Sequence, residues 1–482
     1  MTRLFFPFLV SLALAVPAAA FDAVTPPLPE GLEDTKDQEK KEEPALPPGL
    51  FGEAPPSLPP GLGGTPDNDA AKKMDSRDDS FLGLELTGFT ETRLGFRAQS
   101  DPNQKAASIA EARLQLSFEK AFSLGTLSVT GDLLFDPVAG SYKPRLESGR
   151  GAIDLREVNF LARPTSFADL KIGRQVLTWG TGDLLFINDM FPKDWNAFFI
   201  GRDEEYLKAP SDAVKLAMYS DFANLDVVYT PRFDADRYID GRRLSYFHPG
   251  YNSVVGRNSV VNANRPDSWF GEDEIALRLH RNIGAAEVAV YFYDGYQKSP
   301  NGMDPVLGQA TFPRLRTYGA SLRKTMFSGI ANIEVGFYDS RDDNAGTNPF
   351  VPNGEFRFLA GYERELASEL TGSVQYYLEH MADYDAYRTT LPAGFAAKDK
   401  NRHVLTARLT KLAMNQTLTW SLFAYYSPSD QDAYLRPKVS YKLTDAWLLE
   451  GGANWFIGKN DYSFFGQFER NSNIFAAVRY SF

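Results

Sequence analysis

Arginine and lysine side chains recur at positions that would share one face of an extended chain. Arg278, for example, lies between two leucines and shares its face with Glu274 and His280. A row of cations along a water-filled passage favours anions, because each cation passes a negative solute to the next without a deep trap. The predicted inward-facing cations are Arg93, Arg97, Arg113, Lys215, Arg278, Arg323, Arg357, Arg408, Arg436, Lys438, Lys442 and Arg479.

Carboxylates fall on the same faces, so the cations have two alternative roles. Toward the C-terminal strands the cations outnumber the carboxylates, with only Glu450 near them, which predicts one positive wall. Alternatively, the cations pair with carboxylates across strands and keep the wall hydrated. The predicted inward carboxylates are Glu85, Glu91, Glu111, Asp132, Asp226, Glu274, Glu334, Glu363, Glu379 and Glu450.

The link after Thr178 differs from the other connections in its many aromatic residues. A solvated external loop has little use for large apolar rings, so we expect this loop to fold into the barrel and narrow it. An external cap that packs on neighbouring loops is the alternative. The mixed-charge run at 202–208 is of the kind that usually forms a solvated face. The candidate constriction residues are Trp179, Asp183, Asp189, Asp194 and Trp195.

Arg174 departs from the alternation of its strand, because it shares a face with the apolar Leu170 and Ile172. A bulge at the strand end could turn its side chain inward, as barrel rims often allow. Otherwise the guanidinium lies on the outside, at the level of the lipid headgroups.

The sequence offers little for catalysis or for metal binding. It contains no cysteine, which excludes disulfides and c-type haem attachment, and its four histidines form no recognisable Ser/His/acid grouping. The acidic stretch at 339–344 carries oxygen ligands that suit calcium, but its spacing matches no calcium-binding loop. We therefore expect a protein that is not an enzyme, with no catalytic residue, no metal and no cofactor.

The segments that carry these residues alternate apolar and polar side chains with a period of two. Ile333 and Val335, for example, oppose Asn332 and Glu334. In a transmembrane barrel such a strand turns one set to lipid and the other to the lumen. The pattern, which continues to the end of the chain, predicts an all-β fold, an antiparallel transmembrane barrel of about 18 strands.

The connections support the same architecture, because short links alternate with long ones rich in Gly, Asn, Asp and Pro. Outer-membrane barrels have short periplasmic turns and long external loops, and an even strand number places both termini in the periplasm. A barrel of this size leaves an aqueous passage, whereas one of about eight strands fills its interior. Short links are predicted near 120–123, 163–168, 220–223, 281–284, 326–328, 366–369, 412–415 and 442–445.

The first 80 residues are expected to be two separate segments. Residues 1–20 combine a basic residue, a short apolar run and small residues at a cleavage position, which predicts a signal peptide. Residues 21–80 are rich in Pro and acids and cannot bury enough apolar surface to fold, so we expect a disordered periplasmic linker. Its repeated Leu-Pro-Pro-Gly-Leu phrase is either a spacer or a docking motif for a periplasmic partner. The barrel then occupies 81–482.

The predicted partners follow from the expected location in the outer membrane. The last strand places Ile474, Val478 and Phe482 on one face, and its aromatic end resembles the signature that barrel-assembly machinery reads in outer-membrane proteins. Outer-membrane lipids, lipopolysaccharide and small anionic solutes are the other expected partners. Nucleic acid is excluded by a formal net charge of −11. No apolar run approaches the roughly 20 residues of a spanning helix.

One hairpin resembles a known family. Residues 153–160, followed by Gly173-Arg174-Gln175 and then Trp179-Gly180, resemble the hairpin of alginate-export-type porins and related substrate-specific barrels. In that family a Gly-Arg-Gln strand end leads into a Trp/Tyr-Gly turn. The resemblance implies an eighteen-stranded channel for anionic saccharides or other small anions, with an arginine-rich lumen.

Together these features predict a porin-like channel of a Gram-negative outer membrane, for passive passage of small hydrophilic and chiefly anionic solutes such as saccharides or carboxylates. The alternative is a barrel that serves as sheath or scaffold for a periplasmic complex in secretion or electron transfer. A barrel lipid hydrolase is a third class, for which the histidines give no support.

Overall fold

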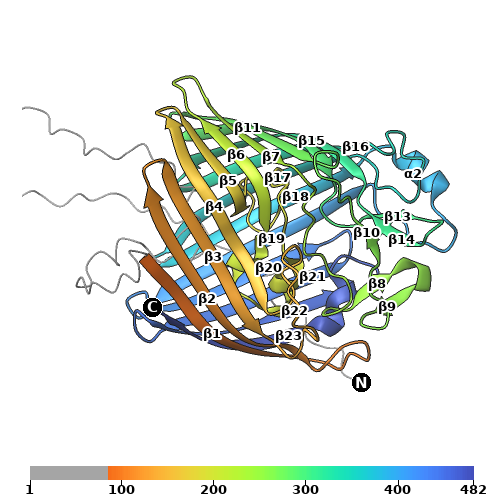
Figure 1. The fold of residues 1–482 in the computed structure, drawn as a ribbon. Helices are drawn as coiled ribbons and strands as arrows, with labels where there is room; N and C mark the ends of the chain where they lie inside the picture. The colour runs from red at the N-terminus through yellow and green to blue at the C-terminus, as the bar shows by residue number, and fades with distance from the viewer. Residues whose placement is uncertain (1–84) are drawn as a thin grey trace, which may run out of the picture. The chain divides into compact units, whose positions relative to one another are not determined.

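The computed structural model describes residues 85–482 (Figure 1). The predicted signal peptide (1–20) and linker (21–80) lie outside the described residues. Both segments therefore stay predictions.

Eighteen strands form one closed antiparallel sheet. The last strand, β23, pairs with the first, β1, from Phe89 opposite Ser481 to Arg97 opposite Asn473. Closure leaves this sheet without a free edge and confirms the predicted barrel. The strands are β1 (Glu85–Arg97), β2 (Ala107–Phe122), β3 (Gly125–Phe135), β4 (Ile153–Thr165), β5 (Ala168–Val176), β6 (Pro210–Met218), β7 (Asn224–Thr230), β11 (Glu274–Ile283), β12 (Ala286–Tyr296), β15 (Arg314–Met326), β16 (Gly329–Ser340), β17 (Glu355–Ala367), β18 (Leu370–Met381), β19 (Asn401–Ala413), β20 (Leu418–Ser427), β21 (Asp432–Lys442), β22 (Trp447–Gly458) and β23 (Asn473–Ser481).

The connections at the two ends of the barrel differ in length. The eight predicted short links are the turns at one end, where the C-terminus also lies (Figure 1). The links at the other end are longer, except for the four residues between β20 and β21. They contain α1 (Trp195–Ile200), α2 (Tyr384–Thr390), the 3-10 turns η3 (Glu204–Leu207), η4 (Pro249–Tyr251) and η5 (Gly466–Asn471), and the short strands β8 (Tyr246–His248), β9 (Ser253–Val255), β10 (Ala263–Asn264), β13 (Gly302–Asp304) and β14 (Gln309–Thr311).

Most side chains that point away from the barrel axis are apolar and exposed. In β19, Leu405 and Leu409 are 49% and 45% exposed, whereas Thr406 and Arg408 are each 4% exposed. An exposed apolar belt of this kind is what a lipid-facing surface requires. Among residues 85–482, no helix has the length and apolar character needed to cross a bilayer. The belt continues round the barrel with Leu94, Leu133, Ile172, Leu279, Val290, Leu322, Ile333, Val374, Leu422, Ile474 and Val478.

Large exposed aromatic side chains lie at both ends of the strands, on either side of the apolar belt. Aromatic girdles at the two membrane interfaces are typical of outer-membrane barrels. Those of the short-turn end are Phe122, Phe167, Phe222, Phe327 and Trp447, and those toward the long loops are Phe96, Phe135, Phe337, Phe356, Tyr426 and Trp455.

Arg174 lies on the outer face of the barrel, which decides between the two alternatives for this residue. The ladder between β5 and β6 runs without a bulge from Ala168 to Val176, so nothing turns the side chain inward. The guanidinium forms a two-point ion pair with Asp212, at 2.7 and 2.6 Å. The pair stands near the long-loop end of these strands, as expected for a charge at the headgroup level.

The two faces of one strand should respond differently to a charge. Val374 is 60% exposed on the outside of β18, whereas the neighbouring Ser373 faces the interior between Glu363 and Arg408. We expect Val374→Arg to destabilise the barrel by about 2–4 kcal/mol, the cost of arginine at the bilayer midplane. Ser373→Arg, the matched control, should cost much less. Denaturant unfolding in lipid vesicles measures both, and equal losses would contradict the assignment of faces.

Candidate functional site

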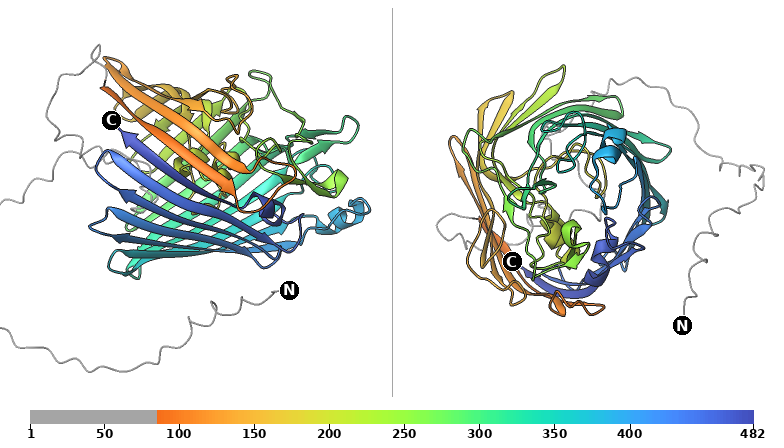
Figure 2. Two further views of the ribbon diagram at one scale, coloured as in Figure 1. Left: turned by 90° about the horizontal axis from the view of Figure 1, so that it is seen from below. Right: turned by 90° about the vertical axis from the view of Figure 1, so that its right-hand side faces the viewer.

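The link between β5 and β6, residues 177–209, lies inside the barrel and is called the inner loop below. Seen along the barrel axis, its helix α1 lies within the ring of strands (Figure 2). Its residues contact inward-facing side chains of widely separated strands, from Glu334 on β16 to Glu111 on β2. The external-cap alternative does not describe this loop.

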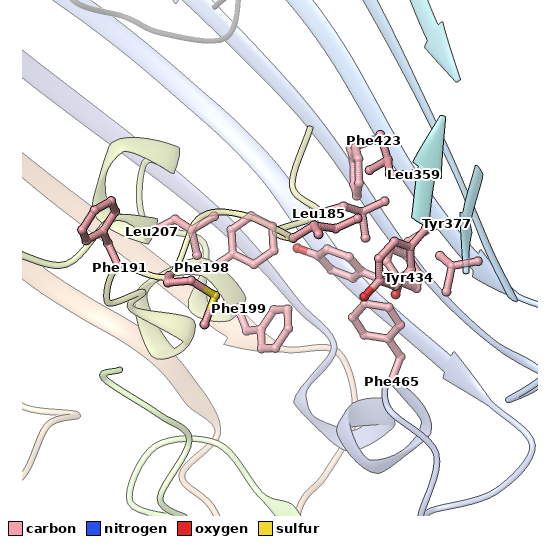
Figure 3. Close-up of a cluster of buried hydrophobic side chains, with 14 of the residues drawn as sticks. Leu185, Phe191, Phe198, Phe199, Leu207, Leu359, Tyr377, Phe423, Tyr434 and Phe465 are labelled. Atoms are coloured by element: carbon pink, nitrogen blue, oxygen red, sulfur yellow. The ribbon is translucent and has the colours of Figure 1, made fainter. Parts of the chain in front are cut away.

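Apolar side chains of the inner loop pack against an aromatic part of the wall. Phe198 and Phe199 of α1 meet Tyr434 of β21 with ring centroids 5.9 and 5.6 Å apart (Figure 3). Phe199 also meets Phe456 of β22 at 5.1 Å. All four rings are nearly or fully buried. Removing these rings from water is the main favourable contribution to docking of the loop.

Irregular backbone inside a barrel needs hydrogen-bond partners, and the wall provides them. Glu334 is fully buried and accepts hydrogen bonds from the backbone N–H groups of Thr181 (2.9 Å) and Asn188 (2.8 Å), one on each carboxylate oxygen. Gln375 of β18 accepts from the N–H of Asp183 and donates to its carbonyl. These contacts fix the first half of the loop.

Gly201 ends α1 at a place where only glycine fits. Its φ of +88° is left-handed, and a Cβ atom there would stand 2.2 Å from the ring of Phe475. Its carbonyl accepts a hydrogen bond of 2.6 Å from Arg93. The chain thus turns against β23 and β1, which brings the acidic residues that follow to the wall.

Charge also holds the inner loop, at Asp183 in its first half and at Asp203 and Glu204 in its second half. We name Arg408 (β19), Arg436 and Lys438 (β21) and Arg479 (β23) the basic wall. Arg408 donates twice to Asp183 at 2.7 and 2.8 Å. Glu204 lies 2.6 Å from Arg436 and 3.5 Å from Arg408, and Asp203 lies 3.4 Å from Arg479.

These surroundings change the proton affinity of the loop acids. Burial alone would raise the pKa of the Asp203 carboxyl, but nearby cations, chiefly Lys438 and Arg479, hold that pKa below its ordinary value. Burial would also raise the pKa of the Glu204 carboxyl, but the nearby cations Arg408 and Arg436 hold that pKa below its ordinary value. Both groups are therefore carboxylates at neutral pH.

Most of the predicted inward cations have carboxylate partners. Arg93 joins Glu91 at 2.9 Å and Glu450 at 2.7 Å, and Lys438 joins Glu450 at 2.8 Å. Ion pairs are present for nine of the twelve, namely Arg93, Arg113, Lys215, Arg278, Arg357, Arg408, Arg436, Lys438 and Arg479.

The three other predicted cations differ from one another. Arg97 donates to the carbonyls of Lys105, Ala107 and Arg243, whereas Arg323 and Lys442 have no ion pair within residues 85–482. Six of the nine paired cations join a carboxylate on another strand, whereas Arg357 pairs with Glu355 of its own strand and Arg408 and Arg436 pair with the inner loop. Cross-strand pairing, the second interpretation of the cations, therefore describes half of the twelve. Their role in solute passage stays a prediction.

The predicted constriction residues have different positions within the inner loop. Only Asp183 reaches the basic wall. Asp189 accepts from Thr178 and pairs with Lys193, and Asp194 caps α1 by accepting from the N–H of Ala197. The indole of Trp195 donates to Asp236, and Trp179 packs against the rings of Phe191 and Tyr291. These four residues contact other parts of the loop or the residues around it, and their role in a constriction stays a prediction.

Sequence reasoning missed Asp203 and Glu204, which were placed in a solvated mixed-charge run. The structure instead places both against the basic wall. The available signal was the excess of cations on the last strands, because buried guanidinium groups require partners from elsewhere in the chain.

Toward the short turns, the interior is lined by small polar side chains. Ser117 and Thr130 hydrogen-bond across β2 and β3 at 2.8 Å, and both are partly exposed. Ser373, Ser421 and Ser440 also face inward and are partly exposed. This part of the lumen is polar and accessible to water.

The chain resembles known proteins in its three-dimensional structure only. No model of a protein family matches the chain, and no curated protein matches it. Among solved structures, Pseudomonas aeruginosa OccK11 (OpdR) is similar at 8% identity with a TM-score of 0.49, covering 83% of this chain and 95% of that chain.

Acinetobacter baumannii OccAB1 is similar at 10% identity with a TM-score of 0.49, covering 83% of this chain and 95% of that chain. A triple mutant of Rhodopseudomonas blastica porin is similar at 9% identity with a TM-score of 0.37, covering 83% of this chain and all of the porin. The resemblance of the 153–180 hairpin to alginate-export-type porins stays a prediction.

Replacing Glu334 by glutamine tests the anchor of the inner loop. One acceptor oxygen becomes an NH2 group that faces a backbone N–H, and a buried donor without an acceptor costs about 1–3 kcal/mol. We expect faster hydrogen exchange at the N–H groups of Thr181 and Asn188. Glu363→Gln is the matched control, because Glu363 also faces inward but forms no hydrogen bond with the described loop. Unchanged protection in E334Q would contradict the anchoring role.

Proposed function

We propose that the protein is an outer-membrane channel for passive passage of small hydrophilic solutes. The observation that carries this proposal is the opposite character of the two barrel faces. The outer face is an exposed apolar belt, whereas the inner face is polar and partly hydrated. Closed barrels of sixteen to eighteen strands leave an aqueous passage, and the eighteen strands here fall in that class.

The outer membrane is the proposed location because its proteins combine closed barrels with short turns at one end and long loops at the other. With the short turns in the periplasm, the C-terminal Phe482 also lies there, where assembly machinery would reach it. Membrane lipids and lipopolysaccharide would then surround the apolar belt and its rim charges, such as the pair of Arg174 and Asp212.

Anionic solutes, such as acidic saccharides or carboxylates, are the proposed preferred class. The planar guanidinium groups of Arg408, Arg436 and Arg479 suit carboxylate oxygens, and all three face the lumen. A sheath around a periplasmic partner is less compatible with this barrel, because the inner loop already fills part of the interior with a packed core.

Deletion of residues 183–203 should raise single-channel conductance in planar bilayers. The deleted segment contains most of the inner loop, so its removal opens space inside the barrel. The wild-type barrel should give ohmic steps without any added partner. A barrel that stays silent would contradict the channel, and a deletion variant with unchanged conductance would contradict a constriction by this loop.

The absence of cysteine allows a direct test of the hydrated lumen. Ser421 faces the interior of β20, and the adjacent Leu422 is 40% exposed on the outer face. A charged, water-soluble thiol reagent should reduce the current through a Ser421→Cys barrel and leave a Leu422→Cys barrel unaffected. Equal behaviour of the two variants would count against a water-filled interior.

A further inference from the structure

Two carboxylates of the inner loop occupy the places on the basic wall where an anionic solute would bind. Glu204 lies 2.6 Å from Arg436 and 3.5 Å from Arg408, and Asp203 lies 3.4 Å from Arg479. The next residue, Glu205, is exposed and makes no ion pair with the described part of the chain. Two of three consecutive acids therefore pair with the wall, and the third does not.

The wall is preorganised for carboxylate binding. The side chains of Arg436 and Arg408 are only 1% and 4% exposed, and their guanidinium carbons lie 4.6 and 5.1 Å from the ring centroids of Phe198 and Phe423. Stacking on these rings fixes each guanidinium plane in one orientation. The buried Nε atom of Arg436 has no hydrogen-bond partner, so this arginine keeps unused donor capacity.

We propose that the basic wall is a carboxylate-binding site and that Asp203 and Glu204 act as its internal competing ligands. A solute carboxylate binds when it displaces a loop carboxylate from its arginine. This inference rests on the proposed channel function, because it defines how that channel selects anions. Its consequence is a channel whose preference for anions is weak until the loop carboxylates are removed or displaced.

Glu204 competes strongly with a solute carboxylate because it is covalently attached to the inner loop. A ligand held on a short segment acts at an effective concentration of about millimolar. Dilute anionic solutes therefore compete poorly with Glu204, whereas concentrated ones displace it. The competing group belongs to the chain itself, so the selectivity of the channel depends on the position of the inner loop.

The decisive comparison uses two substitutions that each remove one carboxyl group from the same turn, and it is made well above pH 7 because burial and the nearby Asp203 raise the pKa of Glu205 to about 7. Glu204→Gln frees Arg436, whereas Glu205→Gln, its matched control, frees no cation. Reversal potentials in a KCl gradient give the chloride-to-potassium permeability ratio of each barrel. We expect a severalfold rise in E204Q, a larger one in D203N/E204Q, and little change in E205Q.

Several outcomes would overturn the proposal. Equal shifts of the permeability ratio in E204Q and E205Q would show that the ratio depends only on the net charge of the loop. A wild-type barrel already strongly selective for chloride would show that the wall is not masked. Adding Arg436→Gln to E204Q should return the ratio to the wild-type value, and failure to do so would exclude Arg436 as the unmasked site.

A second measurement does not depend on conduction. A polarity-sensitive dye on Glu205→Cys reports movement of the loop turn, and glutarate serves as the carboxylate probe. We expect a saturable emission change with glutarate and none with KCl at the same ionic strength. The same response to both salts, or no response to either, would refute displacement. Barrels that do not conduct but show the glutarate response would refute the channel function alone.

Discussion

Complete satisfaction of backbone hydrogen bonds is the constraint on which the structure depends. Lipid offers no partner to an N–H or C=O group, so a spanning sheet must close on itself. Closure is achieved between β1 and β23, whose ladder joins the two ends of the described sheet. The same constraint applies to the inner loop, whose irregular backbone obtains its partners from inward-facing side chains such as Glu334 and Gln375. The wall is therefore both the boundary of the lumen and the scaffold for what lies within it.

Three kinds of interaction hold the inner loop, and they act on different parts of it. Neutral and charge-assisted hydrogen bonds fix the stretch from Thr181 to Asn188, aromatic packing fixes α1, and ion pairs fix the turn at 203–204. The first two remain when salt is added, because they depend on desolvation and geometry. The ion pairs are partly exposed on the carboxylate side, so a competing carboxylate can reach their cations. The acidic turn is thus the most easily displaced part of the loop.

The fold was predictable because its determinants are local. Alternation along each strand and the residues of the short turns act within a few positions, so the strand number and all eight turns were correctly predicted. The contacts of the inner loop were not predictable in the same way. Asp183 and Arg408 are 225 residues apart in the sequence, and Glu204 and Arg436 are 232 apart. No periodicity links such pairs, and only the aromatic excess of the segment indicated that it belongs inside.

Stability and selectivity are coupled in this lumen through the burial of its cations. Arg93, Arg113 and Arg436 have side chains that are only 1% exposed, and an unpaired charge at that depth is strongly destabilising. A strongly anion-selective channel needs cations that are solvated well enough to exchange their partners. The basic wall meets both requirements only if a carboxylate is always present, either from the loop or from a solute. A binding site that is never empty can be strongly basic and still be compatible with a stable barrel.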